Sequence, residues 1–395
     1  MNSDHRPRMT FLDRFLPVWI ILAMAAGLLI GRVVPGIGDA LRALEVGGIS
    51  LPIALGLLVM MYPPLAKVRY DKAGEIAADK RLMTVSLVLN WLVGPAFMFA
   101  LAWIFLPDQP ELRTGLIIVG LARCIAMVLV WSDLSCGDRE ATAVLVAINS
   151  VFQVIMFGVL GWFYLQVLPA WLGLATTSAE FSFWSIVVSV LVFLGIPLAA
   201  GVASRIIGEK TKGRAWYENT YLPKISPLAL IGLLYTIVLL FSLQGEQITS
   251  QPWTVARLAV PLLAYFVGMF AIALIAAKAS GMNYAQSASV SFTAAGNNFE
   301  LAIAVAIGTF GATSAQALAG TIGPLIEIPV LVGLVYTMLW LGPKLFPQDP
   351  TLPVSSTPSP QPAVSEKENF TSCAPTQQSC SSASATAASP RWPQP

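Results

Sequence analysis

The sequence predicts an all-α polytopic membrane protein, and its composition and its hydropathy pattern both support this fold class. Hydrophobic residues make up 56% of the 395 residues, charged residues only 11%, and the mean hydropathy is +0.72. Soluble domains carry about a quarter charged residues, so this chain lacks the polar surface that a water-soluble protein needs. Its apolar residues also gather in ten long runs, each near the roughly 20 residues that a helix needs to cross a bilayer.

Each apolar run predicts one membrane-spanning helix, because short polar segments separate the runs. The first run is long and is not followed by a small-residue cleavage pattern, which argues against a cleaved signal peptide. The predicted spans cover residues 15–34, 46–66, 82–106, 113–132, 141–168, 181–204, 225–243, 254–277, 284–309 and 316–343.

The positions of the basic residues predict the orientation of these spans. Of the 23 Lys and Arg residues, 18 fall in the set of loops that includes both termini. The opposite loops hold four, namely Arg32, Arg42, Arg113 and Arg257, and Arg123 lies inside the fourth span. Because basic loops stay cytoplasmic, we expect a multi-pass protein of the plasma membrane with its N- and C-termini in the cytoplasm.

The chain divides into a membrane domain, residues 1–346, and a polar tail, residues 347–395. The tail is rich in Ser, Thr, Pro, Gln and Ala. Such a segment cannot bury enough apolar area to offset its ordering entropy, so we expect a disordered cytoplasmic tail. Its two cysteines, Cys373 and Cys380, could sequester a thiol-binding ligand near the cytoplasmic mouth, but a pair in such a segment is more often incidental.

The two halves of the membrane domain resemble each other at an offset of about 174 to 176 residues. Arg81-Leu82, for example, recurs as Arg257-Leu258. Five spans per half is an odd number, so we predict two inverted five-helix repeats, about 11–173 and 181–346. In inverted-repeat transporters the substrate site lies near the bilayer midplane, where a discontinuous helix from each repeat contributes to it. Chance similarity between Gly- and Leu-rich helices remains the alternative.

Spans four and nine are the candidates for the discontinuous helices, because both carry polar residues near their middle. Span four holds Arg123 and Cys124, and span nine holds Asn297, Asn298 and Glu300. A charged side chain at this depth costs about 2.5–3.5 kcal/mol on insertion scales, so it has to face a cavity or a partner. The Gly-Asn-Asn triplet of span nine is a poor helix sequence, and unwound backbone is tolerated only where it lines protein or water.

Four segments of the chain closely resemble the arsenical-resistance-3 family of arsenite efflux permeases, in the bile acid/arsenite/riboflavin transporter superfamily. The segments are Ala-Arg-Cys-Ile-Ala-Met-Val-Leu-Val-Trp at 122–131, Cys-Gly-Asp-Arg-Glu at 136–140, Gly-Asn-Asn-Phe-Glu-Leu-Ala at 296–302 and the Pro-rich stretch at 323–333. The resemblance extends over about residues 11–345. It implies ten helices, with discontinuous helices 4 and 9 crossing in a core domain.

The resemblance also implies a function, which is export of arsenite, and in some members antimonite, from the cytoplasm against protons. In that family, transport depends on the cysteine and the glutamate that correspond to Cys124 and Glu300. Four further positions match family residues linked to activity: Arg123, Trp131, Asn149 and Asn298. No cofactor is implied, and a separate cytoplasmic arsenic chaperone or reductase is compatible with this function as a partner.

The chemistry of arsenite agrees with Cys124 as its ligand. Arsenite in water is a small, largely neutral trihydroxide whose soft arsenic prefers sulfur. A single thiolate suits capture followed by release, and Arg123 beside it would stabilise the thiolate. Asn149 and Asn298 would donate hydrogen bonds to arsenic hydroxyls or satisfy backbone freed by the helix breaks. The simpler alternative for Cys124 is a small buried apolar side chain.

Glu300 and Glu327 are the candidates for proton coupling, since a carboxylate in an intramembrane cavity can change its charge during a transport cycle. Two alternatives remain open from the sequence. Glu300 could form a structural ion pair with Arg123, and Glu327 could have a structural role. Glu327 lies 174 residues after Gln153, so both halves place a polar side chain at this position.

Other function classes find little support. The net charge of +2 gives no reason to expect a nucleic-acid partner, and the single histidine, His5, leaves no His-ligated metal site. The chain has no phosphate-binding loop for ATP and no intramembrane protease pattern, so we expect a transporter rather than an enzyme. A sodium-coupled organic anion carrier and a passive channel are the alternatives. Asp138 is expected to cap the fifth span rather than to line a cytoplasmic mouth beside Cys136.

Overall fold

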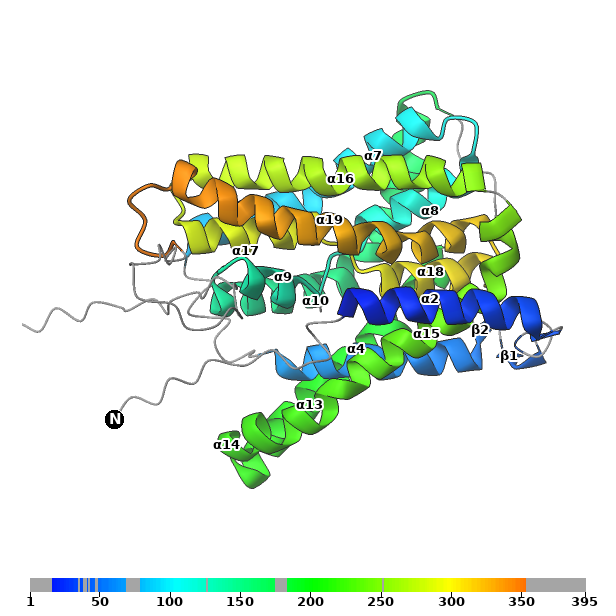
Figure 1. Ribbon diagram of the computed structural model, residues 1–395, viewed down its shortest axis with the longest axis horizontal. Coiled ribbons are helices and arrows are strands. Elements are labelled where there is room, and N and C mark those ends of the chain that lie inside the picture. Colours follow the sequence, from blue (N-terminus) through cyan, green and yellow to red (C-terminus); the bar gives the residue numbers. More distant parts are fainter. Residues whose placement is uncertain are drawn as a thin grey trace, which may run out of the picture.

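The computed structural model describes residues 16–34, 36–37, 41, 43–46, 49–68, 79–125, 127–174, 183–250 and 252–352. In this part the protein is helical apart from one antiparallel hairpin, β1 (Glu45–Val46) with β2 (Ile49–Ser50) (Figure 1). Six helical segments are long and apolar enough to cross a membrane, and three shorter apolar helices accompany them. The predicted all-α polytopic membrane fold is confirmed, while tail residues 353–395, with Cys373 and Cys380, lie outside the described residues.

All ten predicted spans coincide with helical segments. The first half contains α2 (Leu16–Val33), α4 (Leu51–Lys67), α6 (Lys80–Val88), η2 (Leu89–Val93), α7 (Gly94–Phe105), α8 (Pro110–Leu121), α9 (Met127–Leu134), α10 (Arg139–Trp162), η3 (Phe163–Val167) and α11 (Leu168–Trp171). The second half contains α12 (Phe183–Val190), η4 (Leu191–Gly195), α13 (Ile196–Lys212), α14 (Arg214–Trp216), η5 (Tyr217–Tyr221), α15 (Leu222–Ser250), α16 (Pro252–Ala279), α17 (Tyr284–Ala295), α18 (Phe299–Phe310) and α19 (Ala315–Leu345).

Side-chain caps fix the start of several helices. In each case the side chain accepts a hydrogen bond from the backbone N–H three residues further on, which satisfies one of the N–H groups without a helical partner. These caps are Asp79 for α6, Asp138 for α10, Asn283 for α17 and Ser314 for α19. The expected cap at Asp138 is thereby confirmed, with the Ala141 amide 3.0 Å from its carboxylate.

Four short π-helical segments, η2 to η5, widen long helices, and a proline follows each of them. The prolines are Pro95, Pro169, Pro197 and Pro223. A proline ring clashes with the carbonyl four residues earlier in a regular helix and supplies no N–H to it. In all four cases that carbonyl belongs to the central residue of the π segment, so the wider turn accommodates the ring.

The helices form two groups (Figure 1). Helices α2, α4, α13 and α15 pack together, while α7 to α10 and α16 to α19 form a larger group that contains the interrupted helices. Close contact between α2 and α15 needs glycine: a Cβ on Gly27 would lie 2.7 Å from the Val238 carbonyl oxygen, and one on Gly31 would lie 2.5 Å from that of Ser242. Small residues of this kind let helix backbones approach closely in a membrane.

The two ends of the larger group are tied by polar contacts of different kinds. At one end Arg257 of α16 pairs with Asp108, in the segment between α7 and α8, and this hydrogen-bonded ion pair lowers the pKa of Asp108 to about 2. At the other end Arg81 donates to the Gly281 carbonyl, and the Asp349 carboxylate accepts from the Tyr284 amide. The start of the segment expected as tail thus packs on the N-terminus of α17.

Candidate functional site

Two interrupted helices meet in the larger group. Helix α8 ends at Leu121 and α9 begins at Met127, whereas α17 ends at Ala295 and α18 begins at Phe299. Both interruptions lie inside the ranges in which the sequence predicts discontinuous helices. We call the unwound residues 122–124 and 296–298 the two breaks.

The two breaks pair with each other as a short antiparallel bridge. Arg123 lies opposite Asn297, the Cys124 amide donates to the Gly296 carbonyl at 3.3 Å, and the Asn298 amide donates to the Ala122 carbonyl at 3.0 Å. Unwound backbone at membrane depth needs hydrogen-bond partners inside the protein. Each break therefore supplies partners for the other, which fixes their relative position.

A side chain from a neighbouring helix holds each break. The Gln153 side chain of α10 accepts from the Arg123 amide at 2.9 Å and donates to the Arg123 carbonyl at 3.0 Å. The Glu327 carboxylate of α19 accepts from the Asn297 amide at 3.3 Å. Both side chains are buried, so these contacts form in a water-poor environment.

Arg123 is fully buried, and its guanidinium group has neutral partners. It donates to the Tyr265 hydroxyl at 2.7 Å, to the Ala294 carbonyl at 3.5 Å and at close range to the Gly120 carbonyl. The sequence left open an ion pair between Arg123 and Glu300, and the structure contains no such pair. Tyr265 lies in an apolar stretch of α16, where a tyrosine is easily taken for another core residue.

Cys124 places a thiol where the breaks meet. The side chain is 2% exposed and packs against Gly296, where a Cβ atom would lie 3.0 Å from the Cys124 Cβ and 3.5 Å from its Sγ. The thiol therefore occupies space that any larger residue at position 296 would take.

Several buried polar atoms of the breaks and of helices α9 and α10 have no hydrogen-bond partner in the structure. They are Arg123 Nε, Trp131 Nε1, Asn149 Nδ2, both side-chain amide atoms of Asn297, and Asn298 Nδ2. Most of these atoms are hydrogen-bond donors, and a buried donor without an acceptor costs about 1–3 kcal/mol. Donors in this state favour a ligand that carries oxygen acceptors.

The other amide atoms of Asn149 and Asn298 already have partners. The Asn149 Oδ1 atom accepts from the indole N–H of Trp91 in η2 at 3.1 Å. The Asn298 Oδ1 atom caps α18 by accepting from the Leu301 amide at 3.0 Å. Each asparagine is thus oriented through its oxygen, which leaves its N–H₂ group as the donor.

Glu300 is the second residue of α18 and is half-buried. The N–H groups at a helix N-terminus favour a carboxylate at this position. Glu300 follows the second break by two residues and Glu327 of α19 bonds that break at Asn297, so both candidate proton carriers lie beside it. The structure therefore brings Cys124, Arg123, Asn298, Glu300 and Glu327 into the region of the breaks.

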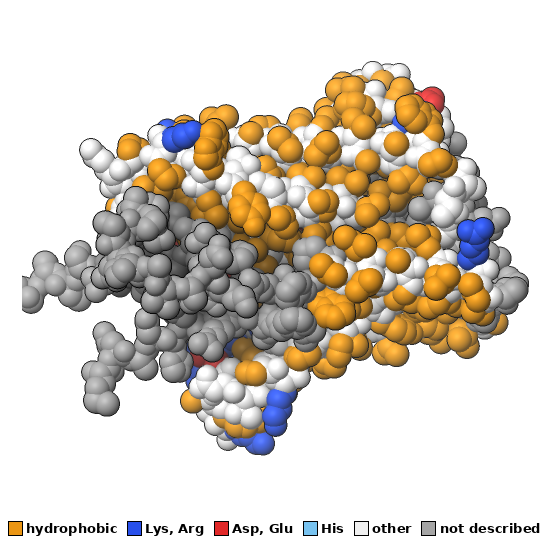
Figure 2. Space-filling view, viewed as in Figure 1, with side chains coloured by type: hydrophobic (Ala, Val, Ile, Leu, Met, Phe, Trp, Pro, Cys, Tyr) orange, Lys and Arg blue, Asp and Glu red, His pale blue; other side chains and the backbone are white. Residues whose placement is uncertain are grey.

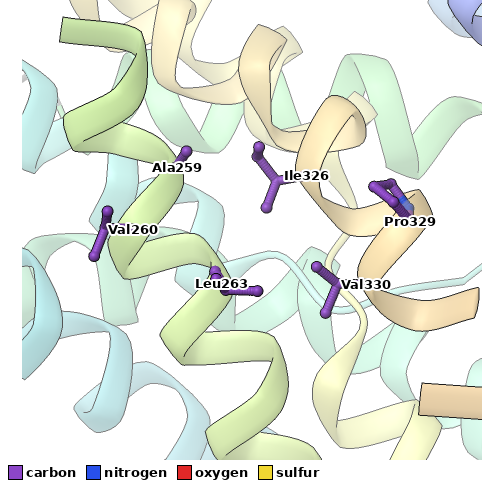
Figure 3. A pocket seen from close by; sticks show the side chains of 6 residues that line it. All are labelled: Ala259, Val260, Leu263, Ile326, Pro329 and Val330. Carbon is purple, nitrogen blue, oxygen red and sulfur yellow. The ribbon is translucent and has the colours of Figure 1, made fainter. Parts of the chain in front are cut away.

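A cavity of about 240 Å³ opens between α16 and α19. Figure 3 shows its lining, which consists of Ala259, Val260, Leu263, Ile326, Pro329 and Val330. No lining side chain is polar, so the cavity offers no ligand for a metalloid or a proton. Within the described part of the chain, no three His, Cys, Asp or Glu residues are grouped as a metal site.

Comparison with known proteins adds independent information. The profile of the Sodium Bile acid symporter family matches residues 54–251. The arsenical-resistance protein Acr3 of Corynebacterium glutamicum is 81% identical over 354 residues, which cover 90% of this chain and 96% of that protein.

Two more distant relatives extend over nearly the same region. An uncharacterized transporter of Synechocystis is 33% identical over 365 residues, covering 87% of this chain and 92% of the relative. The arsenical-resistance protein Acr3 of Alkaliphilus metalliredigens is 32% identical over 335 residues, covering 82% and 91%.

Proposed function

The chain belongs to the Acr3 arsenical-resistance proteins of the Sodium Bile acid symporter family, and we propose that it exports arsenite from the cytoplasm in exchange for protons. Its family is one of membrane transporters, not of enzymes. The observation that carries the proposal is the buried thiol of Cys124 at the bridge between two interrupted helices. Export of this kind would confer arsenic resistance on the cell.

The residues around the breaks suit capture and release of arsenite. The thiolate of Cys124 binds arsenic, which prefers sulfur, and the positive charge of the adjacent residue, Arg123, stabilises the thiolate. The N–H groups of Asn149, Asn298 and Trp131 that lack partners donate to the arsenic hydroxyls. One thiolate with hydrogen-bonding neighbours holds the metalloid less tightly than several thiolates would, which permits its release.

Protons enter the cycle at Glu300 and Glu327. Protonation from outside neutralises the carboxylate environment and releases the arsenic, and loss of the proton to the cytoplasm restores binding. Each unit of charge that crosses the membrane contributes about 2.3 kcal/mol per 100 mV, so the membrane itself can supply the driving force.

The transport domain consists of ten spans in two inverted repeats with crossed helices 4 and 9, and both termini are cytoplasmic. The ends of the first half-helices support this topology: α8 covers Pro110–Leu121 and α17 covers Tyr284–Ala295, a shift of 174 residues at both ends. The bridge at Arg123 and Asn297 joins residues that are also 174 apart. The repeats therefore contribute equivalent segments to one site.

The test is arsenite uptake into inverted vesicles, with and without a pH gradient. We expect gradient-driven accumulation by the wild type, and loss of accumulation in Cys124→Ser and in Glu300→Gln. A variant with Cys136, Cys373 and Cys380 replaced by serine keeps Cys124 and is the matched control, expected to transport. Equal uptake by wild type and Cys124→Ser would contradict the role of the thiolate.

The family profile carries the name of sodium symporters, so a sodium-coupled carrier is the second candidate. Accumulation that requires a sodium gradient in the same vesicles would establish it. Uptake that only equilibrates, whatever the gradient, would indicate a channel. Antimonite, added in place of arsenite, shows whether the site accepts both metalloids.

A further inference from the structure

The two breaks are held by side chains at equivalent places in the chain. Gln153 lies 30 residues after Arg123, whose backbone it bonds, and Glu327 lies 30 residues after Asn297. Gln153 and Glu327 are themselves 174 residues apart, the same offset that separates Arg123 from Asn297. Each half of the protein therefore uses the same device, in which a side chain from the following long helix, α10 or α19, bonds the unwound backbone.

The two devices differ in chemistry. An amide side chain offers both a donor and an acceptor, and Gln153 uses both on the backbone of one residue, Arg123. An ionised carboxylate is only an acceptor, so Glu327 can bond the Asn297 amide but has no hydrogen to donate. A protonated Glu327 gains an O–H donor, and with it the capacity to reproduce the two bonds that Gln153 makes.

We propose that Gln153 and Glu327 are equivalent positioning residues, of which Gln153 holds its break permanently and Glu327 holds its break fully only when protonated. The proton on Glu327 then donates to the Asn297 carbonyl, and its loss releases that bond. This inference rests on the proposed exchange of arsenite for protons and assigns to Glu327 the part of that exchange that acts on the backbone.

The bridge transmits this change to the substrate site. Asn297 lies between Gly296, whose carbonyl accepts from the Cys124 amide, and Asn298, whose amide donates to the Ala122 carbonyl. Both cross-bridge hydrogen bonds therefore belong to the immediate neighbours of the residue that Glu327 holds. A looser second break alters the position of Gly296, and Cys124 packs directly against Gly296.

The charged and titratable groups around Glu327, among the described residues, favour a switch at this site. Glu300 lies in the first turn of α18, three residues after Asn297. Tyr265 of α16 binds through its hydroxyl the guanidinium of Arg123, the residue that lies opposite Asn297 in the bridge. Carboxyl groups that share a site resist simultaneous ionisation. The amide of Gln153 does not titrate, so the switch is confined to the half of the molecule that contains Glu327.

Exchange of the two side chains tests the proposal. Purified full-length protein is reconstituted in vesicles, and arsenite–arsenite exchange at equal pH on both sides is measured between about pH 5 and 8, together with accumulation driven by a pH gradient. In Glu327→Gln the second break is held at every pH. We expect this variant to lose gradient-driven accumulation, and its arsenite exchange should no longer vary with pH.

The double variant Gln153→Glu with Glu327→Gln moves the proton-dependent device to the first break. We expect it to regain pH-dependent exchange and part of the accumulation, whereas Glu327→Ala, with neither amide nor carboxyl, stays inactive in both assays. The proposal would be overturned if the double variant accumulates no more arsenite than Glu327→Gln while thermal unfolding shows that both proteins are folded.

The single variant keeps the proposal testable if the double variant does not fold. Exchange by Glu327→Gln with the pH profile of the wild type would also overturn it. The two proposals fail in different ways. If accumulation by the wild type does not depend on the pH gradient, the proposed proton exchange is wrong. If the wild type accumulates arsenite with the pH gradient but the double variant does not, only the proposed equivalence of Gln153 and Glu327 is wrong.

Discussion

At the residue scale, Gly296 determines where the Cys124 thiol can lie. Its backbone has φ −74° and ψ 144°, a conformation open to any residue, so the need for glycine arises from space alone. Alanine at this position would place its Cβ 3.0 Å from the Cys124 Cβ. We expect Gly296→Ala to lower the turnover of arsenite by roughly tenfold while the protein remains folded, because small displacements of a reacting group have large effects on rate.

The matched control for this variant is Gly333→Ala in α19, where an added Cβ meets no atom within 4 Å. Transport by Gly333→Ala should equal that of the wild type. Thermal unfolding of both proteins separates a local effect from a loss of fold. Wild-type turnover in Gly296→Ala would show that the thiol tolerates displacement and would weaken its assignment as ligand.

Tyr265 supplies a hydrogen-bond acceptor to the buried guanidinium group of Arg123. Its hydroxyl accepts a hydrogen bond from the Arg123 guanidinium at 2.7 Å in a fully buried environment. Removal of this acceptor in Tyr265→Phe should lower the free energy of unfolding by about 1.5–3 kcal/mol, the range for hydrogen bonds to charged groups. Thermal unfolding in detergent measures the effect. Tyr336→Phe, on the exposed face of α19, is the control and should leave stability unchanged.

The residues of the site were predictable from the sequence to different degrees. Cys124, Arg123 and Glu300 stand out because they are polar residues inside long apolar runs, where their presence is costly. Tyr265 and Trp91 were missed, because aromatic residues are common in apolar helices and only the fold brings their polar atoms to Arg123 and Asn149. The absence of an Arg123–Glu300 ion pair also needed the structure, since the two residues lie in different spans and only the fold shows that the guanidinium bonds Tyr265 and two backbone carbonyls instead.

At the scale of elements, the sequence predicted the spans but not their irregular turns. Apolar runs of about 20 residues locate helices well, because length and hydropathy are sufficient for that purpose. The π segments depend on a steric relation between each proline and a carbonyl four residues earlier, which hydropathy does not register. The interruption at Gly296 was foreseeable because the triplet there is a poor helix sequence, while the pairing of both breaks required the three-dimensional arrangement.

The π segment η2 positions a side chain of the site. Its central residue is Trp91, which donates to Asn149 Oδ1 at 3.1 Å, and Pro95 lies four residues further on. In Pro95→Ala the ring clash that disfavours a regular helix, worth roughly 3 kcal/mol, is absent, so we expect η2 to tighten and Trp91 to turn away from Asn149. Arsenite affinity should fall, without loss of thermal stability.

The corresponding change at η5 serves as the control. Pro223→Ala removes the same steric cause from a segment, Tyr217–Tyr221, that supplies none of the proposed substrate ligands. Its arsenite affinity should match that of the wild type. Equal loss of affinity in both variants would mean that the prolines act through general helix packing, and η2 would then have no specific part in the site.

At the scale of the whole molecule, the basic residues separate toward the two ends of the helices. Helices α16 and α19, which carry Lys278 and Lys344 in their last turns, both end at the left in Figure 1. Arg113 and Arg257 lie in the opposite part of the sequence of each helix, near the starts of α8 and α16. On the face in view in Figure 2, apolar side chains are spread over the described surface between the two ends. These four described residues lie on the sides that the sequence predicts for them, which makes the orientation in the membrane testable.

The last prediction concerns that orientation. Gln109, just before α8, and Thr211, near the end of α13, are both exposed and lie on opposite sides of the predicted membrane. In a chain whose Cys136, Cys373 and Cys380 are replaced by serine, Gln109→Cys should react with a membrane-impermeant maleimide in intact cells, and Thr211→Cys only after the cells are permeabilised.

The physical reason is the excess of Lys and Arg on the Thr211 side, since basic loops are retained in the cytoplasm during insertion. The buried Cys124 remains in both proteins and supplies the background of labelling. Labelling of Thr211→Cys in intact cells, with Gln109→Cys protected, would show that the orientation is the opposite of the predicted one. In that case the face that carries Gln109 and Arg257 would be the cytoplasmic one, while the direction of exchange would still follow from the proton gradient, which drives an antiporter in either orientation.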